Sequence, residues 1–302
     1  MSQDRPLEVL SEDQVRQYRE RGYLVLERRI PEAALEGLRA EIGRFIEEAR
    51  SLTASDDRID LEDSHRPDRP RVRRIKSPFQ NSGVFEALAR SEAILAPVRD
   101  LLGADLRLHG SKLNMKAAGY GAAVEWHQDW AFYPHTNDDV LAVGVMLDDM
   151  APENGPLMVM PGTHLGPVFD HHAGGVFAGA VDLAAANLDP EDTVMLTGPA
   201  GSISLHHVRT MHGSAVNRSE RDRRLLLYEI AAADAFPIVG TSSFYGGLEE
   251  FNSRMLCGEA TLEPRVRAAP VRIPQPEPDT TGSIYEIQKA LKARTFGVAA
   301  ET

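Results

Sequence analysis

Cysteine and long apolar runs are the two features that this sequence most clearly lacks. Cys257 is the single cysteine among 302 residues, which excludes an internal disulfide and any metal site built from several thiolates. No apolar stretch approaches the roughly 20 residues that a membrane-spanning helix needs. The first residues, Met1 to Pro6, are polar and charged, so they do not resemble a secretory signal. We therefore expect a cytoplasmic protein without a membrane partner.

Positive charge is also scarce. Lys and Arg number 33 against 45 Asp and Glu, which gives a formal net charge of -12. A chain this acidic is a poor match for the phosphate backbone of nucleic acid. The expected partner is therefore a small molecule, bound by a monomer or a homodimer, and the acidic total still leaves room for a local basic pocket.

Helical and β patterns occupy different parts of the chain. Before Gly103, helices are predicted at 11–19, 30–50 and 84–102, and a strand at 23–26. After it, short apolar runs between Gly, Pro, Asn and Asp predict strands at 105–109, 111–116, 123–129, 140–148, 157–160, 193–197, 201–206 and 223–231. A last short helix is predicted at 283–294. These patterns indicate a mostly β fold, a sandwich or barrel, with the N-terminal helices packed outside it.

One domain is expected to span residues 1–302. It consists of a helical part (1–103), a β core (104–235 with adjoining segments) and a C-terminal extension (259–302). The polar stretch 51–74 is expected to form a flexible loop near the mouth of a site, and 164–190 a lid.

The tripeptide His127-Gln128-Asp129 places a histidine and a carboxylate two positions apart in a predicted strand. Residues i and i+2 of a strand point to the same face, so His127 and Asp129 can reach one ion while Gln128 points away. With a second histidine they form a 2-His-1-carboxylate set. This set binds one face of a non-haem Fe(II) and leaves the opposite face open for a co-substrate and O2. Such a tripeptide alone also arises by chance.

Three histidines can supply the remaining ligand. His206 and His207 lie at the end of a predicted strand, where a histidine is more often a hydrogen-bonded core or surface residue. His212 begins the sequence His212-Gly213-Ser214, and Arg223 follows eleven residues later (223 − 212 = 11). We expect His212 to be the ligand, because this spacing gives it a partner with a chemical role.

The expected role of Arg223 is to bind 2-oxoglutarate, the co-substrate that most often generates the oxidant at such an iron. Its far carboxylate needs a fixed cation, and a guanidinium stays charged and presents parallel donors. Arg223 begins the apolar run 225–228 and can point inward, and Ser214 can donate its hydroxyl to the same carboxylate. The alternative is that Arg221, Arg223 and Arg224 form a solvated basic turn.

Together these segments resemble one known family. His127-Gln128-Asp129, the run from Asn154-Gly155-Pro156-Leu157 to Pro161-Gly162-Thr163-His164, His212-Gly213-Ser214 and Arg223 are similar to the phytanoyl-CoA dioxygenase family of Fe(II)/2-oxoglutarate-dependent oxygenases, over about residues 12–235. The resemblance implies a double-stranded β-helix (a cupin-like jelly roll) in which His127, Asp129 and His212 bind iron. It also implies that Arg223 and Ser214 bind the distal carboxylate of 2-oxoglutarate and that Asn114 contacts this co-substrate.

The implied reaction is hydroxylation, with release of succinate and CO2. Related halogenases replace the carboxylate ligand by a small residue, so an intact Asp129 favours oxidation without halide. Two alternatives remain at this stage: a cupin-like metal enzyme that does not use 2-oxoglutarate, and an inactive small-molecule-binding protein on the same scaffold.

The substrate is expected to be a small or medium polar organic molecule that carries an anionic group. Arg71, Arg73, Arg74 and Lys76 form a basic cluster, and Lys112 lies on a strand that leads to the predicted site. We expect Arg73, Lys76 and Lys112 to meet the anion, and Trp130 and Tyr133 to line the pocket. A solvated basic loop is an equally good interpretation of the arginine run.

Overall fold

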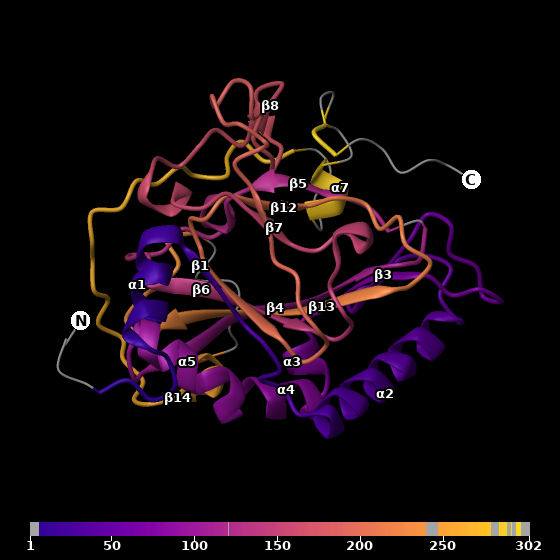
Figure 1. Ribbon diagram of the computed structural model, residues 1–302, viewed down its shortest axis with the longest axis horizontal. Helices are drawn as coiled ribbons and strands as arrows, with labels where there is room; N and C mark the ends of the chain where they lie inside the picture. Colours follow the sequence, from indigo (N-terminus) through magenta and orange to yellow (C-terminus); the bar gives the residue numbers. More distant parts are fainter. Residues whose placement is uncertain are drawn as a thin grey trace.

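The chain folds into two antiparallel sheets that face each other, with helices covering the outer side of the larger sheet (Figure 1). The computed structural model describes residues 6–119, 121–239, 247–278, 284–288, 291 and 294–296. The larger sheet has the order β1 (Tyr23–Leu26), β11 (Ile203–His207), β6 (Val140–Met146), β13 (Arg223–Ala232), β4 (Leu106–Lys116), β3 (Val72–Lys76) and β2 (Ile59–Leu61), and β14 (Met255–Cys257) also pairs with β4. The smaller sheet has the order β10 (Val194–Met195), β7 (Met158–Val159), β12 (His212–Ser214) and β5 (Val124–His127).

The other elements are short or lie outside the sheets. The helices are α1 (Glu12–Arg21), α2 (Glu32–Ala49), α3 (Pro78–Asn81), α4 (Gly83–Ala89), α5 (Glu92–Leu102), α6 (Leu248–Ser253) and α7 (Ile284–Gln288). Three 3-10 turns are η1 (Asp129–Ala131), η2 (Pro152–Asn154) and η3 (Thr163–Leu165), and β8 (His172–Ala173) pairs with β9 (Val176–Phe177). No helix in these ranges is both long and apolar enough to cross a membrane.

The N-terminal helices form where the sequence supplies caps and an apolar face. Ser11 accepts a hydrogen bond from the Gln14 amide while the Gln14 side chain accepts from the Ser11 amide, a capping box that begins α1. Gly22, at φ 79°, ends it. Helix α2 buries Leu35, Leu38, Ile42 and Phe45 at three- and four-residue steps. This face packs on the larger sheet.

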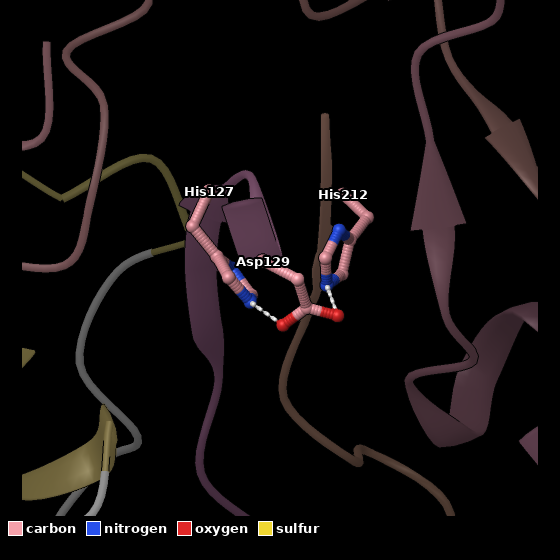
Figure 2. A group of neighbouring side chains, drawn as sticks. All are labelled: His127, Asp129 and His212. Carbon is pink, nitrogen blue, oxygen red and sulfur yellow. Dashed lines mark ion pairs between the residues drawn. The ribbon is translucent and has the colours of Figure 1, made fainter. Parts of the chain in front are cut away.

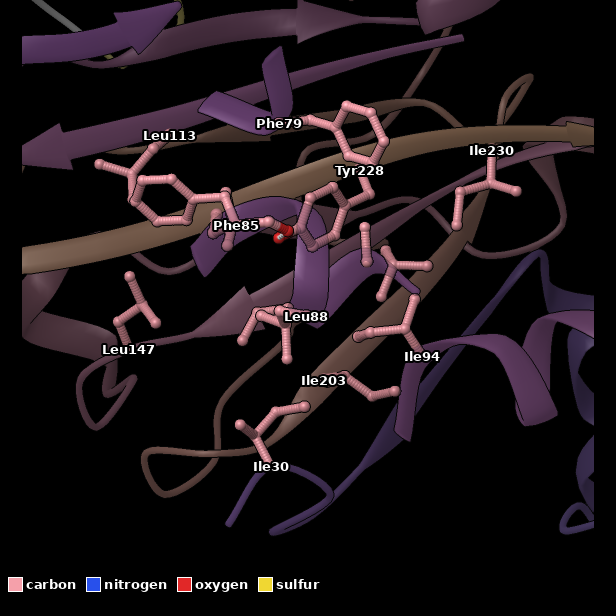
Figure 3. Packing of buried hydrophobic residues seen from close by; sticks show 14 of the residues in the cluster. Ile30, Phe79, Phe85, Leu88, Ile94, Leu113, Leu147, Ile203, Tyr228 and Ile230 are labelled. Atoms are coloured by element: carbon pink, nitrogen blue, oxygen red, sulfur yellow. Dashed lines mark hydrogen bonds between the residues drawn. The ribbon is translucent and has the colours of Figure 1, made fainter. Parts of the chain in front are cut away.

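Strand β13 separates the main core from the space between the sheets. Leu226, Tyr228 and Ile230 point toward the helices and join the main core, which Figure 3 shows around Phe85 and Ile203. The Tyr228 hydroxyl donates to the Phe85 carbonyl over 2.7 Å. The alternate residues, beginning with Arg223, face the smaller sheet. Because neighbours on a strand point to opposite faces, one strand builds both the core and one wall of the site.

The structure corrects several predicted elements. The predicted helix 84–102 is two helices, α4 and α5, because Ser91 takes an extended conformation between them and begins a new helix. The stretch 51–74 contains β2 and most of β3, so it is the edge of the larger sheet rather than one flexible loop. The predicted strands 105–109 and 111–116 are one strand, β4. Of the predicted helix 283–294, α7 is the helical part, and 283, 289–290 and 292–293 lie outside the described residues.

Candidate active site

A pocket of about 490 Å³ lies between the two sheets. Strand β5 with the turn after it, β12, β13 and β4 supply most of its wall, and β3, β11, α7 and the residue before β7 complete it. Its residues are Arg74, Lys112, Asn114, Val124, His127, Asp129, Phe132, Tyr133, Leu157, His206, His212, Gly213, Ser214, Arg223, Leu225, Leu227, Glu229, Ile284, Tyr285 and Ile287. The volume falls in the range of small-molecule sites and leaves room for more than one small ligand.

His127, Asp129 and His212 converge in this pocket (Figure 2). One possible ligand atom from each lies within 4.8 Å of the others, and all three residues are buried. The Nε2 atoms of His127 and His212 lie 3.9 Å and 3.8 Å from the two carboxylate oxygens of Asp129. His127 and His212 are paired residues of the neighbouring strands β5 and β12, which places their rings side by side. This is the arrangement that one metal ion requires.

Backbone carbonyls orient both imidazoles in the same way. Nδ1 of His127 lies 2.8 Å from the Glu125 carbonyl, and Nδ1 of His212 lies 2.9 Å from the Thr210 carbonyl. A carbonyl only accepts, so each Nδ1 carries the proton and each neutral ring presents an Nε2 lone pair to the pocket. Burial lowers the pKa of His127 to about 4, and it also lowers the pKa of His212. Both rings are therefore neutral near pH 7, as metal ligands must be.

The segment that follows His127 differs from the prediction. Strand β5 ends at His127, and Asp129 begins the turn η1 rather than continuing a strand to 129. Gln128 is still extended, at φ -113° and ψ 127°, so His127 and Asp129 face the same side. The Gln128 amide group points the other way, donating to the Pro167 and Arg209 carbonyls and accepting from the Phe169 amide. These contacts fix the segment that carries the carboxylate.

His206 also reaches this centre, whereas His207 does not line the pocket. His206 Nε2 lies 3.6 Å from Asp129 Oδ2, and the ring centroid of His206 lies 4.6 Å from that of His212. Neither ring nitrogen of His206 has a hydrogen-bond partner among the described residues. His206 lies beside the three converging residues and approaches Asp129 Oδ2, the carboxylate oxygen that also faces His212.

Arg223 lies in the same pocket as a buried cation. Its Nε and Nη2 atoms both donate to the Gly155 carbonyl, over 3.1 Å and 2.6 Å, and no carboxylate of the described chain pairs with it. Burial lowers the pKa of Arg223 to about 10, so the guanidinium stays charged at neutral pH. Gly155 has φ 67°, and a Cβ there would lie 2.4 Å from the Ala215 carbonyl oxygen, so the position requires glycine. This gives the Asn154-Gly155-Pro156 segment a physical role.

Ser214 is held beside this arginine by Lys116. Lys116 Nζ donates to the Ser214 hydroxyl oxygen over 2.9 Å and to the Ser214 and Ala215 carbonyls, and burial, with the charge of Arg223, lowers the pKa of Lys116 well below its usual range. Ser214 lines the pocket, so its hydroxyl can donate to an acceptor there. Asn114 lines the pocket too, and its side-chain oxygen is buried without a hydrogen-bond partner. Arg223 and Ser214 give this end of the pocket donors that suit an anion, whereas the Asn114 oxygen is an acceptor.

Lys112 and Glu229 form the wall on the other side of Asp129. Lys112 Nζ lies 2.7 Å from Glu229 Oε1 and 3.7 Å from Asp129 Oδ1. Burial alone would raise the pKa of Asp129, but Lys112 and the nearby histidines outweigh it and hold that pKa well below its usual range. Burial, together with the charges of Asp129 and Glu229, raises the pKa of Tyr133. Asp129 is thus kept ionised and Tyr133 protonated.

Three residues expected to bind substrate lie outside the pocket. Arg73 forms an ion pair with Glu286 of α7, and Lys76 pairs with Asp60 over 2.9 Å. Trp130 is fully buried in an apolar cluster and donates its indole N–H to the Pro270 carbonyl. The register shifts at β2, where Asp60 pairs with Arg74 and Leu61 with Val72, so Arg73 has no partner position.

Arg74, Glu229 and Tyr285 line the pocket although the sequence did not single them out. Arg74 belonged to the basic cluster, and its pairing with Asn114 of β4, which places it in the pocket, leaves no mark in the sequence. Glu229 was detectable, because it lies an even number of positions after Arg223 on the same strand and so faces the same side. Tyr285 comes from the C-terminal extension, which had no motif to connect it to the site.

Comparisons with known proteins agree with this geometry. The model of the family described as "Phytanoyl-CoA dioxygenase (PhyH)" matches residues 18–225. The chain is 36% identical, over 94% of its length and 99% of the relative's, to a "Probable alpha-ketoglutarate-dependent hypophosphite dioxygenase" of Stutzerimonas stutzeri. It is 29% identical to an ectoine dioxygenase of Bordetella parapertussis, over 70% of this chain and 72% of that one.

Solved structures give the same result for the fold. EctD from S. alaskensis with bound Fe superposes with a TM-score of 0.63 and 27% identity, covering 74% of this chain and 77% of that chain. The same protein with 2-oxoglutarate and 5-hydroxyectoine gives a TM-score of 0.61 at 27% identity, covering the same fractions. The predicted fold class, mostly β with a double-stranded β-helix core and flanking helices, is confirmed, although the two sheets do not close into a barrel in the part of the chain described. The chain belongs to the phytanoyl-CoA dioxygenase family of iron- and 2-oxoglutarate-dependent oxygenases.

Proposed function

We propose that His127, Asp129 and His212 bind Fe(II), that Arg223, Ser214 and Asn114 bind 2-oxoglutarate, and that the enzyme oxidises a small anion. One observation carries the proposal. Two neutral imidazoles and an ionised carboxylate face the same pocket as a buried arginine that has no carboxylate partner among the described residues. A buried cation is costly unless it is paired, so the site suits a ligand that brings the missing carboxylate. The donor set also fits iron, which takes imidazole and carboxylate ligands.

Different residues of the chain would bind the metal, hold the co-substrate and exclude water. Iron with 2-oxoglutarate and O2 would supply the oxidising chemistry, in which one oxygen atom goes to succinate and the other to the substrate. Asp129 is fixed as a carboxylate by Lys112 and oriented by the turn after Gln128. Arg223 and Ser214 would hold the distal end of the co-substrate at a constant distance from the metal ligands. Leu225 and Leu227 exclude water from the pocket wall between the metal ligands and the Arg223 end.

The substrate is proposed to be an anion because the pocket holds cationic groups beyond Arg223. Arg74 lines the pocket with a buried Nε, and its guanidinium has no hydrogen-bond or ion-pair partner within the described ranges. Lys112 lies between Asp129 and Glu229 and presents a further ammonium. Tyr133 adds a hydroxyl donor beside them. A small anion placed between Arg74 and Lys112 would lie next to the metal ligands.

Hypophosphite is the first substrate to test, because the relative that matches almost this whole chain is named for it. The balanced reaction would insert one oxygen atom into a P–H bond, giving phosphite, succinate and CO2 from hypophosphite, 2-oxoglutarate and O2. L-proline and ectoine, after which other relatives are named, serve as zwitterionic comparisons.

The experiment measures succinate released by the Fe(II)-loaded enzyme with each compound. We expect succinate to form in proportion to an oxidised anionic product, with one oxygen atom from ¹⁸O2 and no dependence on chloride. Product without succinate would contradict the use of 2-oxoglutarate. Turnover of the zwitterions alone would contradict the anionic substrate while leaving the iron and co-substrate assignments standing.

A further inference from the structure

Helix α7 contributes one wall of the pocket although it lies beyond residues 18–225, the part matched by the family model. Ile284, Tyr285 and Ile287 all face the pocket. The side chain of Gln288 accepts from the Glu125 amide over 2.9 Å and donates to the Gly179 carbonyl over 2.7 Å. Through Glu125 the helix is therefore hydrogen-bonded to β5, the strand that carries His127.

The other side of α7 is fixed by Arg73. Its guanidinium forms an ion pair with Glu286 and lies 5.3 Å above the ring of Tyr285. Only 5% of the Arg73 side chain is exposed, so both contacts are largely shielded from solvent. Contacts on both sides of the helix hold Tyr285 in one place.

The hydroxyl of Tyr285 is buried and has no hydrogen-bond partner in the part of the chain that is described. Burial raises the pKa of Tyr285, so the hydroxyl keeps its proton and acts as a donor. Among charged groups Arg223 has the largest influence on the pKa of Tyr285 and lowers it; Glu62 follows and raises it, and Arg74 and Arg73 lower it. A buried donor without an acceptor is unfavourable, and an anionic ligand at Arg223 would satisfy it.

We propose that Tyr285 is a further co-substrate-binding residue, whose hydroxyl donates to the distal carboxylate of 2-oxoglutarate beside Arg223 and Ser214. This inference rests on the proposed function, because it assigns the anion at Arg223 to 2-oxoglutarate. It adds a donor from the C-terminal extension to those from β12 and β13. The carboxylate would then be surrounded by a guanidinium and two hydroxyls inside a pocket closed by Ile284 and Ile287.

The test compares Tyr285→Phe, which removes the hydroxyl and keeps the ring, with the unsubstituted enzyme. The Fe(II)-loaded proteins are titrated without O2 with 2-oxoglutarate, and the dissociation constant is measured by calorimetry. A hydrogen bond to a charged group predicts that the variant binds about tenfold or more weakly. Tyr18→Phe is the matched control, because Tyr18 also has a buried hydroxyl without a partner but lies outside the pocket. The control should bind 2-oxoglutarate as the unsubstituted enzyme does.

A second ligand locates the contact. 2-Oxopentanoate has the same carbon chain as 2-oxoglutarate with a methyl group in place of the distal carboxylate. The tenfold loss should therefore be absent for 2-oxopentanoate. An equal loss for both ligands, or no loss for 2-oxoglutarate, would overturn the assignment of Tyr285. If the unsubstituted enzyme binds no 2-oxoglutarate, the proposed function itself fails, an outcome separate from a failure of Tyr285 alone.

Discussion

At the scale of single residues, the structure separates His212 from its two neighbours of the same type. His212 points Nε2 into the pocket because its Nδ1–H is bound by the Thr210 carbonyl. His206 lacks such an orienting bond among the described residues and contacts the carboxylate of Asp129 instead. The proposed ligand His212 is thus oriented by a backbone carbonyl, whereas His206 beside it has no such bond among the described residues.

We predict that His212→Ala loses Fe(II), whereas His206→Ala keeps it. The alanine at 212 removes one of three donors, while the alanine at 206 leaves all of them in place. Iron bound per chain, measured by elemental analysis after anaerobic loading and desalting, checks this. Retention by the 212 variant with loss by the 206 variant would show that the ligand was assigned to the wrong histidine.

We predict that Arg223→Ala raises the apparent KM for 2-oxoglutarate about thirtyfold or more, because removing one partner of a buried charge pair typically costs about 2–5 kcal/mol. Iron content should not change. Arg221→Ala is the control, since Arg221 is exposed and pairs loosely with Glu153 at 3.4 Å. A comparable effect in the control would mean that the whole basic turn, rather than Arg223, attracts the co-substrate.

Gly110 makes room for the carboxylate of Glu229. A Cβ at this position would lie 2.4 Å from Glu229 Oε2, so Gly110→Ala must displace that carboxylate and weaken its pairing with Lys112. We predict a several-fold higher KM for the primary substrate with little change for 2-oxoglutarate, in steady-state kinetics of both. Gly43→Ala in α2, where a Cβ meets nothing within 4 Å, should leave both constants unchanged. A change confined to 2-oxoglutarate would contradict the placement of Glu229 on the substrate side.

At the scale of elements, β5 shows how far an alternating pattern can be trusted. The prediction of a strand through residue 129 was wrong by two positions, yet its consequence held because Gln128 stays extended for one more residue. His127 and Asp129 face the same side as long as the one residue between them is extended, and their spacing in the sequence predicts this directly. Where the strand ends is decided by contacts of η1 and the loop from 164 onward, which no local pattern encodes.

We predict that Gln128→Ala destabilises the protein by about 3 kcal/mol, because it leaves buried groups of Pro167, Phe169 and Arg209 without their side-chain partner. For a chain of this size the midpoint of thermal unfolding should fall by roughly 5 °C. Calorimetry of the metal-free protein measures this. Gln80→Ala, at an exposed position, is the control. Equal midpoints for the two variants would show that these bonds do not hold the end of β5.

The edge of the larger sheet shows where sequence reasoning fails. Strands β2 and β3 carry four charged residues beside four apolar ones, but the polar sequence between and before them led to the prediction of a loop. They form strands because β4 offers an edge to pair with and because Ile59 and Ile75 reach the main core. Arg74 then faces the pocket because it pairs with Asn114 of β4, which also lines the pocket. Both facts depend on distant partners, which explains why Arg74 and not Arg73 lines the site.

At the scale of the whole molecule, the two sheets supply different halves of the site. His127, His212 and Ser214 come from the smaller sheet, while Arg223 and Lys112 come from the larger one. The sequence allowed the candidate residues to be named but not their division between the sheets, because ligand chemistry requires a histidine, a carboxylate and an arginine wherever the chain carries them. The sequence did not reveal the contribution of α7, because its residues join the site only through contacts that the C-terminal extension makes with β5 (Figure 1).

Because the sheets share the site, ligands should join them in two distinguishable steps. A metal ion bound by His127, Asp129 and His212 connects β12 of the smaller sheet to β5 and to the turn that follows β5. 2-Oxoglutarate, held by the metal at one end and Arg223 at the other, connects the smaller sheet to the larger one. We therefore predict that the metal raises the midpoint of thermal unfolding and that 2-oxoglutarate raises it again, but only when the metal is present.

The size of the second step follows from mass action. At a concentration one hundred times its dissociation constant, a ligand that binds only the folded state adds about 2.7 kcal/mol, which for 302 residues corresponds to about 4 °C. Differential scanning calorimetry with Mn(II), used as a redox-stable substitute for Fe(II), measures both steps. Arg223→Ala should keep the metal step and lose the second one, and His212→Ala should lose both. A full second step without metal, or in the Arg223 variant, would mean that the co-substrate binds elsewhere and that the site does not join the two sheets.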